Sequence, residues 1–257
     1  MFFITTQIQA QTWDAQKLEL GALQNTTVAE EGDFYVYLNY RFGSLEEDET
    51  TFLNSDNHNI NLKLVYGLWE GLQLGLSWEA WQNTYSGSAK MILMQQSEGY
   101  SMDVTAYGAI HLNGDLSKDN YPFMKEADRL SYTSQILIGK HFSEKIFVEV
   151  APTFVRQNLV WEKIQKHNQF AIGIGGQFRL AEQAAIYVDY VAHFNRNETT
   201  IFKDPLTFGL DFYLGKFILG ISASNAQAFN DASFISNGEG DWGNGGGYLG
   251  LNVIKVF

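Results

Sequence analysis

The C-terminal segment GGYLGLNVIKVF (Gly246–Phe257) decides the fold. Its alternate positions carry apolar side chains with one lysine among them; the row is Leu249, Leu251, Val253, Lys255 and Phe257. Such alternation places the row on one face of a β-strand. Soluble domains usually end in a few loose polar residues, so an aromatic last residue on the apolar face of a strand needs an explanation.

The same period of two recurs along the whole chain. In DFYVYLNYRFG (Asp33–Gly43), aromatic and aliphatic residues alternate with a second row that ends in Asn39 and Arg41. Segments of this kind match the roughly 9–11 residues that a tilted strand needs to cross a bilayer. We predict twelve strands, at 33–43, 58–67, 72–81, 87–95, 101–112, 130–142, 146–155, 168–180, 185–194, 206–215, 216–225 and 246–257.

The connections between these segments fall into two length classes. Alternate connections are very short, at 68–71, 143–145, 181–183 and 215–216. Most of those between are longer and polar, at 44–57, 113–129, 157–167 and 226–245. Short turns at one rim and long loops at the other are typical of outer-membrane barrels.

The face opposite the apolar row carries glycine, serine, threonine, tyrosine and isolated charges. A soluble β-sandwich would place lysine, glutamate and threonine there, whereas this mixture suits a crowded lumen. We therefore predict an all-β, antiparallel, up-and-down transmembrane β-barrel of about twelve strands, with short periplasmic turns and long extracellular loops. Phe257 then lies in the aromatic girdle at the periplasmic interface, and Lys255 reaches toward the headgroups.

Composition excludes several classes of function. The net charge is −12, with 17 basic against 29 acidic residues, which argues against nucleic acid as a partner. The chain has no cysteine, so disulfides and thiolate chemistry are excluded. The five histidines show no metal-ligand spacing, and the loop Ser236–Gly246 lacks the glycine and the acid that a calcium loop needs. We expect no cofactor and no metal.

The N-terminal part divides into two short segments. Residues 1–10 are interpreted as the remnant of a signal peptide that ends at Ala10, with a disordered N-terminus as the alternative. Residues 11–32 form a polar lead that is either periplasmic or inserted into the lumen. Residues 33–257 form the barrel, with no internal domain boundary.

The predicted inward face carries nine charged residues of both signs. One interpretation is a lining that selects ions; the other is a set of mutually neutralising pairs, since an unpaired charge in a confined space is costly. The nine are Arg41, Lys63, Glu79, Lys90, Asp103, Glu149, Arg179, Asp189 and Asp211.

The predicted function is a passive, narrow channel or solute-binding pore with a charged, tyrosine-rich lumen. The alternative is a non-conducting barrel that anchors a partner or binds lipid, and a less favoured third alternative is a membrane-embedded lipid-modifying enzyme. His111 and His193 share the inward face, where hydrogen bonding is their expected role. No Ser/His pair lies on the predicted lipid face, so no catalytic residue is assigned and we expect no enzyme.

Several segments carry a family resemblance. They include YGLWEGLQLGL (Tyr66–Leu76), RLSYTSQILIGKHF (Arg129–Phe142), AIGIGGQFRL (Ala171–Leu180) and AFNDASFI (Ala228–Ile235), followed by the C-terminal strand. On these segments the chain resembles the β-barrel proteins of the domain of unknown function 5777 family, which are widespread in Bacteroidetes-type bacteria.

The resemblance implies a barrel in the outer membrane of a Gram-negative bacterium, and it implies no established activity or catalytic residue. The C-terminal strand ending at Phe257 is similar to the signal that the barrel-assembly machinery recognises. The expected partners are therefore that machinery, outer-membrane lipid with lipopolysaccharide, and small solutes.

Overall fold

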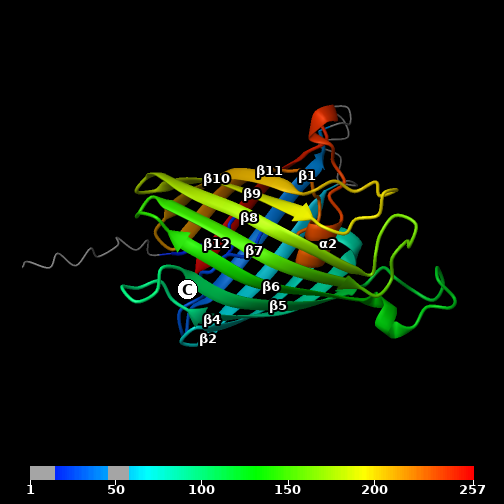
Figure 1. Cartoon of the computed structure of the whole chain (residues 1–257), viewed down its shortest axis with the longest axis horizontal. Helices are drawn as coiled ribbons and strands as arrows, with labels where there is room; N and C mark the ends of the chain where they lie inside the picture. The colour runs from blue at the N-terminus through cyan, green and yellow to red at the C-terminus, as the bar shows by residue number, and fades with distance from the viewer. Residues whose placement is uncertain (1–14, 46–57) are drawn as a thin grey trace, which may run out of the picture.

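The protein is a closed barrel of twelve antiparallel strands, seen from the side in Figure 1. The computed structural model describes residues 15–45 and 58–257, so the predicted signal-peptide remnant at 1–10 lies outside the described residues. Each strand pairs with the next, and β1 pairs with β12 to close the wall. The strands are β1 (Phe34–Ser44), β2 (Asn59–Trp69), β3 (Leu72–Glu79), β4 (Thr84–Met94), β5 (Asp103–Asn113), β6 (Leu130–His141), β7 (Ile146–Gln157), β8 (Asn168–Ala181), β9 (Ala184–His193), β10 (Leu206–Leu214), β11 (Phe217–Ser224) and β12 (Tyr248–Val256).

The two ends of the barrel differ as the connection lengths predict. We call one end the turn rim; its tight connections are 70–71, 142–145, 182–183 and 215–216. The other end is the loop rim, with connections at 114–129, 158–167, 194–205 and 225–247. Figure 1 shows the C-terminus and the short turns at one end and the extended loops at the other. The predicted twelve-stranded, all-β barrel is confirmed.

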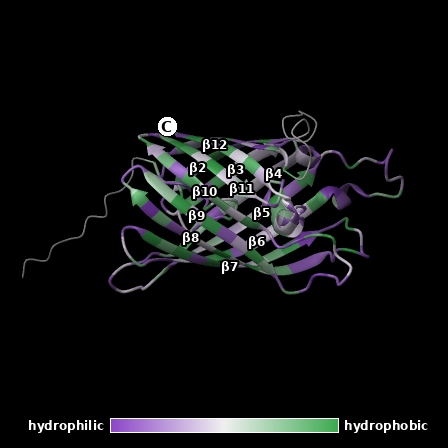
Figure 2. Cartoon of the chain, turned by 90° about the horizontal axis from the view of Figure 1, so that it is seen from above, coloured by the Kyte–Doolittle hydropathy of each residue, from purple (hydrophilic) through white to green (hydrophobic). Residues whose placement is uncertain are grey.

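The outer face of the wall is an apolar band. Leu38, Leu76 and Ile221 are 50%, 67% and 52% exposed, whereas inward-facing neighbours such as Asn39 and Ser222 are buried. Figure 2 shows hydrophobic residues along the strands and hydrophilic residues in the loops. In water, an apolar surface of this extent would drive aggregation, whereas in a bilayer it contacts lipid.

The C-terminal residue lies in this outer band at the turn rim. Phe257 is 54% exposed, and its ring centroid lies 6.2 Å from that of Phe34 across the seam. The ammonium of Lys255 lies 4.2 Å from the centre of the Phe257 ring. This aromatic and basic pair has the composition of a membrane-interface girdle.

Two segments of the chain occupy the inside of the barrel. The first, the N-terminal lead, covers residues 15–32. The second, the inner segment, covers residues 225–237 at the start of the connection between β11 and β12, and it contains the short helix α2 (Asp231–Ser236), which Figure 1 shows within the loop-rim end. Short 3-10 turns lie at Trp81–Asn83, Glu126–Arg129 and Trp242–Asn244.

Within the described residues, no helix is long and apolar enough to cross a membrane.

Candidate functional site

The lead folds into a small turn in the lumen. The Leu20 amide donates to the Leu23 carbonyl over 2.9 Å, and Glu19 forms an antiparallel bridge with Gln24. Leu20 and Leu23 are each only 2% exposed. A Cβ added to Gly175 on β8 would lie 2.1 Å from Leu20 Cδ2, so the bare backbone there provides the space for that leucine.

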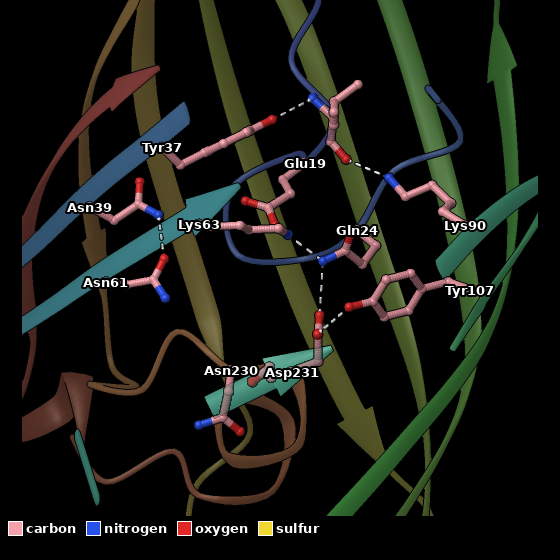
Figure 3. Close-up of polar contacts among 12 residues, drawn as sticks. Glu19, Gln24, Tyr37, Asn39, Asn61, Lys63, Lys90, Tyr107, Asn230 and Asp231 are labelled. Carbon is pink, nitrogen blue, oxygen red and sulfur yellow. Dashed lines mark hydrogen bonds and ion pairs between the residues drawn. The ribbon is translucent and has the colours of Figure 1, made fainter. Parts of the chain in front are cut away.

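Opposite charges attach the lead to the wall. Lys17 Nζ lies 2.8 and 3.0 Å from the two carboxylate oxygens of Asp211 on β10, and both side chains are almost wholly buried. On the other side of the lumen Glu19 pairs with Lys63 on β2, as Figure 3 shows. The Ala22 amide donates to Asp189 Oδ2 over 3.1 Å. The lead therefore provides a cation that pairs with Asp211 and an anion that pairs with Lys63.

Lys90 on β4 binds the backbone of the lead. Its ammonium donates to the carbonyls of Leu18, Asn25 and Thr27 over 2.7, 3.0 and 3.1 Å (Figure 3). An ammonium has three protons, so these contacts use all of its donors. The three carbonyl groups thus supply hydrogen-bond acceptors to a cationic side chain that is only 1% exposed.

The inner segment is attached to the wall at two charged residues. Arg41 on β1 donates from Nη1 to the carbonyls of Ala226 and Ala228, over 2.5 and 2.6 Å. On β3, Glu79 Oε2 accepts from the amides of Phe229 and Asn230, over 2.8 and 3.1 Å. The cation Arg41 thus binds backbone carbonyls of this loop, and the anion Glu79 binds backbone amides a few residues further along it.

The sequence of the inner segment favours a helix at this point. Asn230 accepts from the Ser233 amide over 2.9 Å and caps the first turn of α2. Phe234 and Ile235 follow, and they are 0% and 1% exposed. They pack with Leu23 of the lead and with Val155, Ala171 and Val191 of the wall. The two inner segments therefore share one apolar core.

Asp231 connects the lead, the inner segment and the wall. Its Oδ2 accepts from the hydroxyl of Tyr107 on β5 over 2.6 Å, and its Oδ1 accepts from Gln24 Nε2 over 3.0 Å. Figure 3 shows these two contacts converging on the carboxylate. Gln24 also donates to Glu19 over 3.1 Å, so the network continues to Lys63.

Little space is left between the two inner segments. The polar cavity there, lined by Glu19, Lys63, Tyr107 and Asp231 among others, has a volume of about 40 Å³. That volume holds a few water molecules. A larger space of about 330 Å³ lies on the loop-rim side of α2.

The nine charged residues singled out by sequence lie at different levels of the barrel. Arg41, Lys63, Glu79, Lys90, Asp189 and Asp211 contact the lead or the inner segment as described above. Glu149 is buried on β7 at 1% exposure. Asp103 and Arg179 lie partly exposed near the turn rim, where Asp103 accepts from the Gln96 amide over 2.7 Å.

Sequence reasoning missed the partners of these residues. Lys17 and Glu19 lie in the lead, where their opposite charges two residues apart were the available signal. Asn230 and Asp231 stand two residues before Phe234 and Ile235, with Ala232 and Ser233 between them, which is the pattern of a capped helix with an apolar face.

A second polar cluster fixes the loop between β9 and β10. Asp204 accepts from His193 Nδ1 over 2.9 Å and from Arg196 Nε over 3.0 Å. Burial alone would raise the pKa of Asp204, but the bonds from His193 and Arg196 outweigh it and lower the pKa to about 2. His111, by contrast, lies between Ser86 Oγ at 2.8 Å and Thr133 Oγ1 at 3.2 Å. In the described part of the chain, no three His, Asp or Glu residues group closely enough to hold a metal ion.

Solved structures with the same architecture are porins. The NanC porin superposes with a TM-score of 0.52 at 9% identity, covering 87% of this chain and 98% of the porin. The KdgM porin gives 0.52 at 8% identity, covering 88% and 99%, and its complex with disordered oligogalacturonate gives 0.53 at the same identity and coverage. At such identities the likeness shows the fold alone.

None of the curated proteins compared matches the chain in sequence. Residues 16–257 match the family DUF5777, which is described as a membrane bound beta barrel domain. This match includes the lead from its second described residue together with all twelve strands. The protein with this closed barrel and apolar outer band therefore belongs to the domain of unknown function 5777 family of membrane bound β-barrels.

Proposed function

We propose that this barrel is a narrow outer-membrane channel for small solutes and that the N-terminal lead is its removable plug. The turn rim faces the periplasm, and the loop rim faces the outside. The observation that carries the proposal is the attachment of the lead by matched side chains, Lys17 to Asp211 and Glu19 to Lys63, around a lumen otherwise lined by polar groups. Release of the lead breaks these ion pairs and also separates Leu20 and Leu23 from the apolar groups that they contact in the closed barrel.

The lead is a better candidate for movement than the inner segment. Within the described residues its covalent link to the wall is at β1, and beside this link the Gly32 amide donates to the Gly67 carbonyl of β2 over 2.9 Å. The inner segment lies in a connection that joins both β11 and β12, and every residue of α2 is buried. Release of the lead would uncover Lys63, Lys90, Asp189 and Asp211, a lining of balanced charge that predicts weak ion selectivity.

Single-channel conductance in planar bilayers tests this proposal. Three refolded proteins are compared: the full chain, a variant lacking residues 11–32, and that variant with residues 226–236 also replaced by a Gly-Ser linker. We expect the full chain to be closed for most of the recording, and lead deletion to give steady discrete steps. The double change should give larger steps, because α2 no longer narrows the lumen.

Folding of each variant is checked by the heat-dependent gel shift of an intact barrel. If both deletion variants fold and neither conducts, the channel proposal fails. The second candidate, a non-conducting barrel that anchors a partner or binds lipid, would then stand. The cavity of only about 40 Å³ between the inner segments is the observation that favours it. Both candidates are non-enzymatic.

A further inference from the structure

The space on the loop-rim side of α2 has the size of a small-molecule site. This vestibule, about 330 Å³, lies between the loops 114–129 and 158–167, with Asn230, Ser233 and Asn237 of the inner segment at its floor. Small-molecule pockets span roughly 300–1,000 Å³, so this one fits a solute of one or two rings. Because α2 is its floor, the vestibule ends where the closed lumen begins.

Side-chain amides supply most of its polar surface, and hydrogen bonds hold them in place. Asn113 Nδ2 donates to Gln82 Oε1 over 2.9 Å, and Asn158 Nδ2 donates to the Ala127 carbonyl over 2.7 Å. Gln165 Nε2 donates to Asn237 Oδ1 over 2.5 Å and connects the loop 158–167 to the floor. An amide has two donors and an acceptor with two lone pairs, so each keeps hydrogen-bonding capacity for a ligand. Groups already ordered lose little entropy on binding.

Aromatic side chains stand beside these amides. Trp161 is 77% exposed and Tyr121 is 48% exposed, and both line the vestibule together with Phe202. Large aromatic rings left open to solvent next to hydrogen-bonding groups suit a ligand with an apolar ring face and a polar edge.

Three charged residues line the vestibule, Asp128, Arg129 and Glu239, and the first two have hydrogen-bond partners. Arg129 donates from Nε to the Asn113 carbonyl over 3.1 Å and from Nη2 to the Gly114 carbonyl over 3.3 Å, and its Nη1 lies 3.5 Å from Glu126. Asp128 Oδ2 accepts from the Lys125 amide over 2.8 Å. An anionic solute would find the cation Arg129 already engaged by Glu126 and two carbonyls, and desolvation would oppose the binding of any ionic solute.

We propose that the vestibule binds a neutral saccharide of one or two rings. The sugar ring lies against Trp161, and its hydroxyls bond Asn158, Gln165 and the floor of α2. The inference deepens the proposed channel function by naming the class of solute. It concerns binding to the closed full chain, which does not depend on conduction.

Isothermal titration calorimetry on the refolded full chain in detergent tests the inference. The neutral probes are maltose, lactose and N-acetylglucosamine; galacturonic acid and glucosamine are the charged probes. We expect at least one neutral sugar to bind with a Kd of about 1 mM or tighter and both charged sugars to bind more weakly. Trp161→Ala should weaken that binding about tenfold.

The matched control is Trp69→Ala, which removes a tryptophan that is 62% exposed next to the tight turn 70–71 at the opposite rim. It should leave the affinity unchanged. The inference is overturned if no neutral sugar binds, if a charged sugar binds as tightly, or if Trp161→Ala and Trp69→Ala have the same effect. Binding by a barrel that fails the conductance test would instead retain the site and reject only the channel.

Discussion

At the scale of single residues, the pair Lys17–Asp211 carries the most consequence. The side chains are 5% and 1% exposed, so each charge depends on the other for its stability in the lumen. Replacing one member leaves a buried charge unpaired, which costs about 3–5 kcal/mol. In this barrel the cost destabilises the closed state relative to the open state, because water reaches the remaining charge once the lead is released.

Lys17→Met is therefore expected to raise the open probability of the channel, measured as the fraction of time spent conducting in a planar bilayer. The control is Lys203→Met. It breaks a 3.0 Å pair with Asp241 whose side chains are 53% and 38% exposed, and such surface pairs contribute about 0–1 kcal/mol. Equal open probabilities for the two variants would show that the pair with Asp211 does not hold the lead.

The Asp204 carboxylate predicts a pH dependence of the loop 194–205. Its pKa of about 2 lies below the value of about 3.9 of an unperturbed aspartate. The contribution to loop stability is thus fully present above about pH 4 and is lost as pH falls toward 2. An NMR titration of carboxyl-labelled aspartate should show this group titrating near pH 2, and Asp204→Asn should remove the loop's change in amide exchange between pH 4 and 2. Titration near pH 4 would contradict the assignment.

At the scale of elements, α2 depends on Glu79. The carboxylate accepts from the amides of Phe229 and Asn230, and from the side chain of Asn230. In Glu79→Gln one oxygen becomes an NH₂ that faces donors, so either the two backbone amides or the side-chain NH₂ of Asn230 lose their acceptor. A buried unsatisfied donor costs about 1–3 kcal/mol.

Amide hydrogen exchange over residues 226–236 should accelerate in Glu79→Gln by a factor of about 5–150, which corresponds to that free energy. Glu70→Gln, at the exposed turn between β2 and β3, serves as the control and should leave this exchange unchanged. Unaltered exchange in both variants would mean that packing of Phe234 and Ile235 alone holds α2.

The strands and the interior were predictable to different degrees. Alternation in segments such as Asp33–Gly43 identifies the apolar face of each strand, and in a membrane barrel that face must contact lipid. The positions of all twelve strands can therefore be predicted from the alternation. The interior depends on which non-strand segment folds into the lumen. Tertiary contacts decide this, and they leave no periodic pattern in the sequence. The lead was expected at the periplasm or in the lumen, and Lys17 and Glu19 bind it in the lumen. The connection 226–245 was expected to be an extracellular loop, but its first part, around Asp231, binds inside. The nine charges were predicted on the inward face from the alternation, but no pattern in the strands encodes their partners.

At the scale of the whole molecule, the apolar band predicts a depth-dependent tolerance to charge. Leu251 is 45% exposed in the middle of β12, and Leu214 is 49% exposed next to the turn 215–216. An arginine costs about 2–4 kcal/mol at the bilayer midplane and about 0–1 kcal/mol near an interface. Urea unfolding in lipid vesicles should therefore show Leu251→Arg clearly destabilised and Leu214→Arg nearly unchanged. Equal losses would place the band at a different height on the wall.

The pairing of β1 with β12 determines when in its assembly the barrel can close. Tyr35 pairs with Val256, and the Phe257 amide donates to the Phe34 carbonyl over 3.0 Å, so the wall joins residues from the two ends of the described chain. These hydrogen bonds cannot form until the last strand has been synthesised. The lead is continuous with β1, so the circle closes around a segment already linked to its first strand. Loss of β12 would accordingly produce an open sheet with two unpaired edges, prone to aggregation, instead of a smaller barrel.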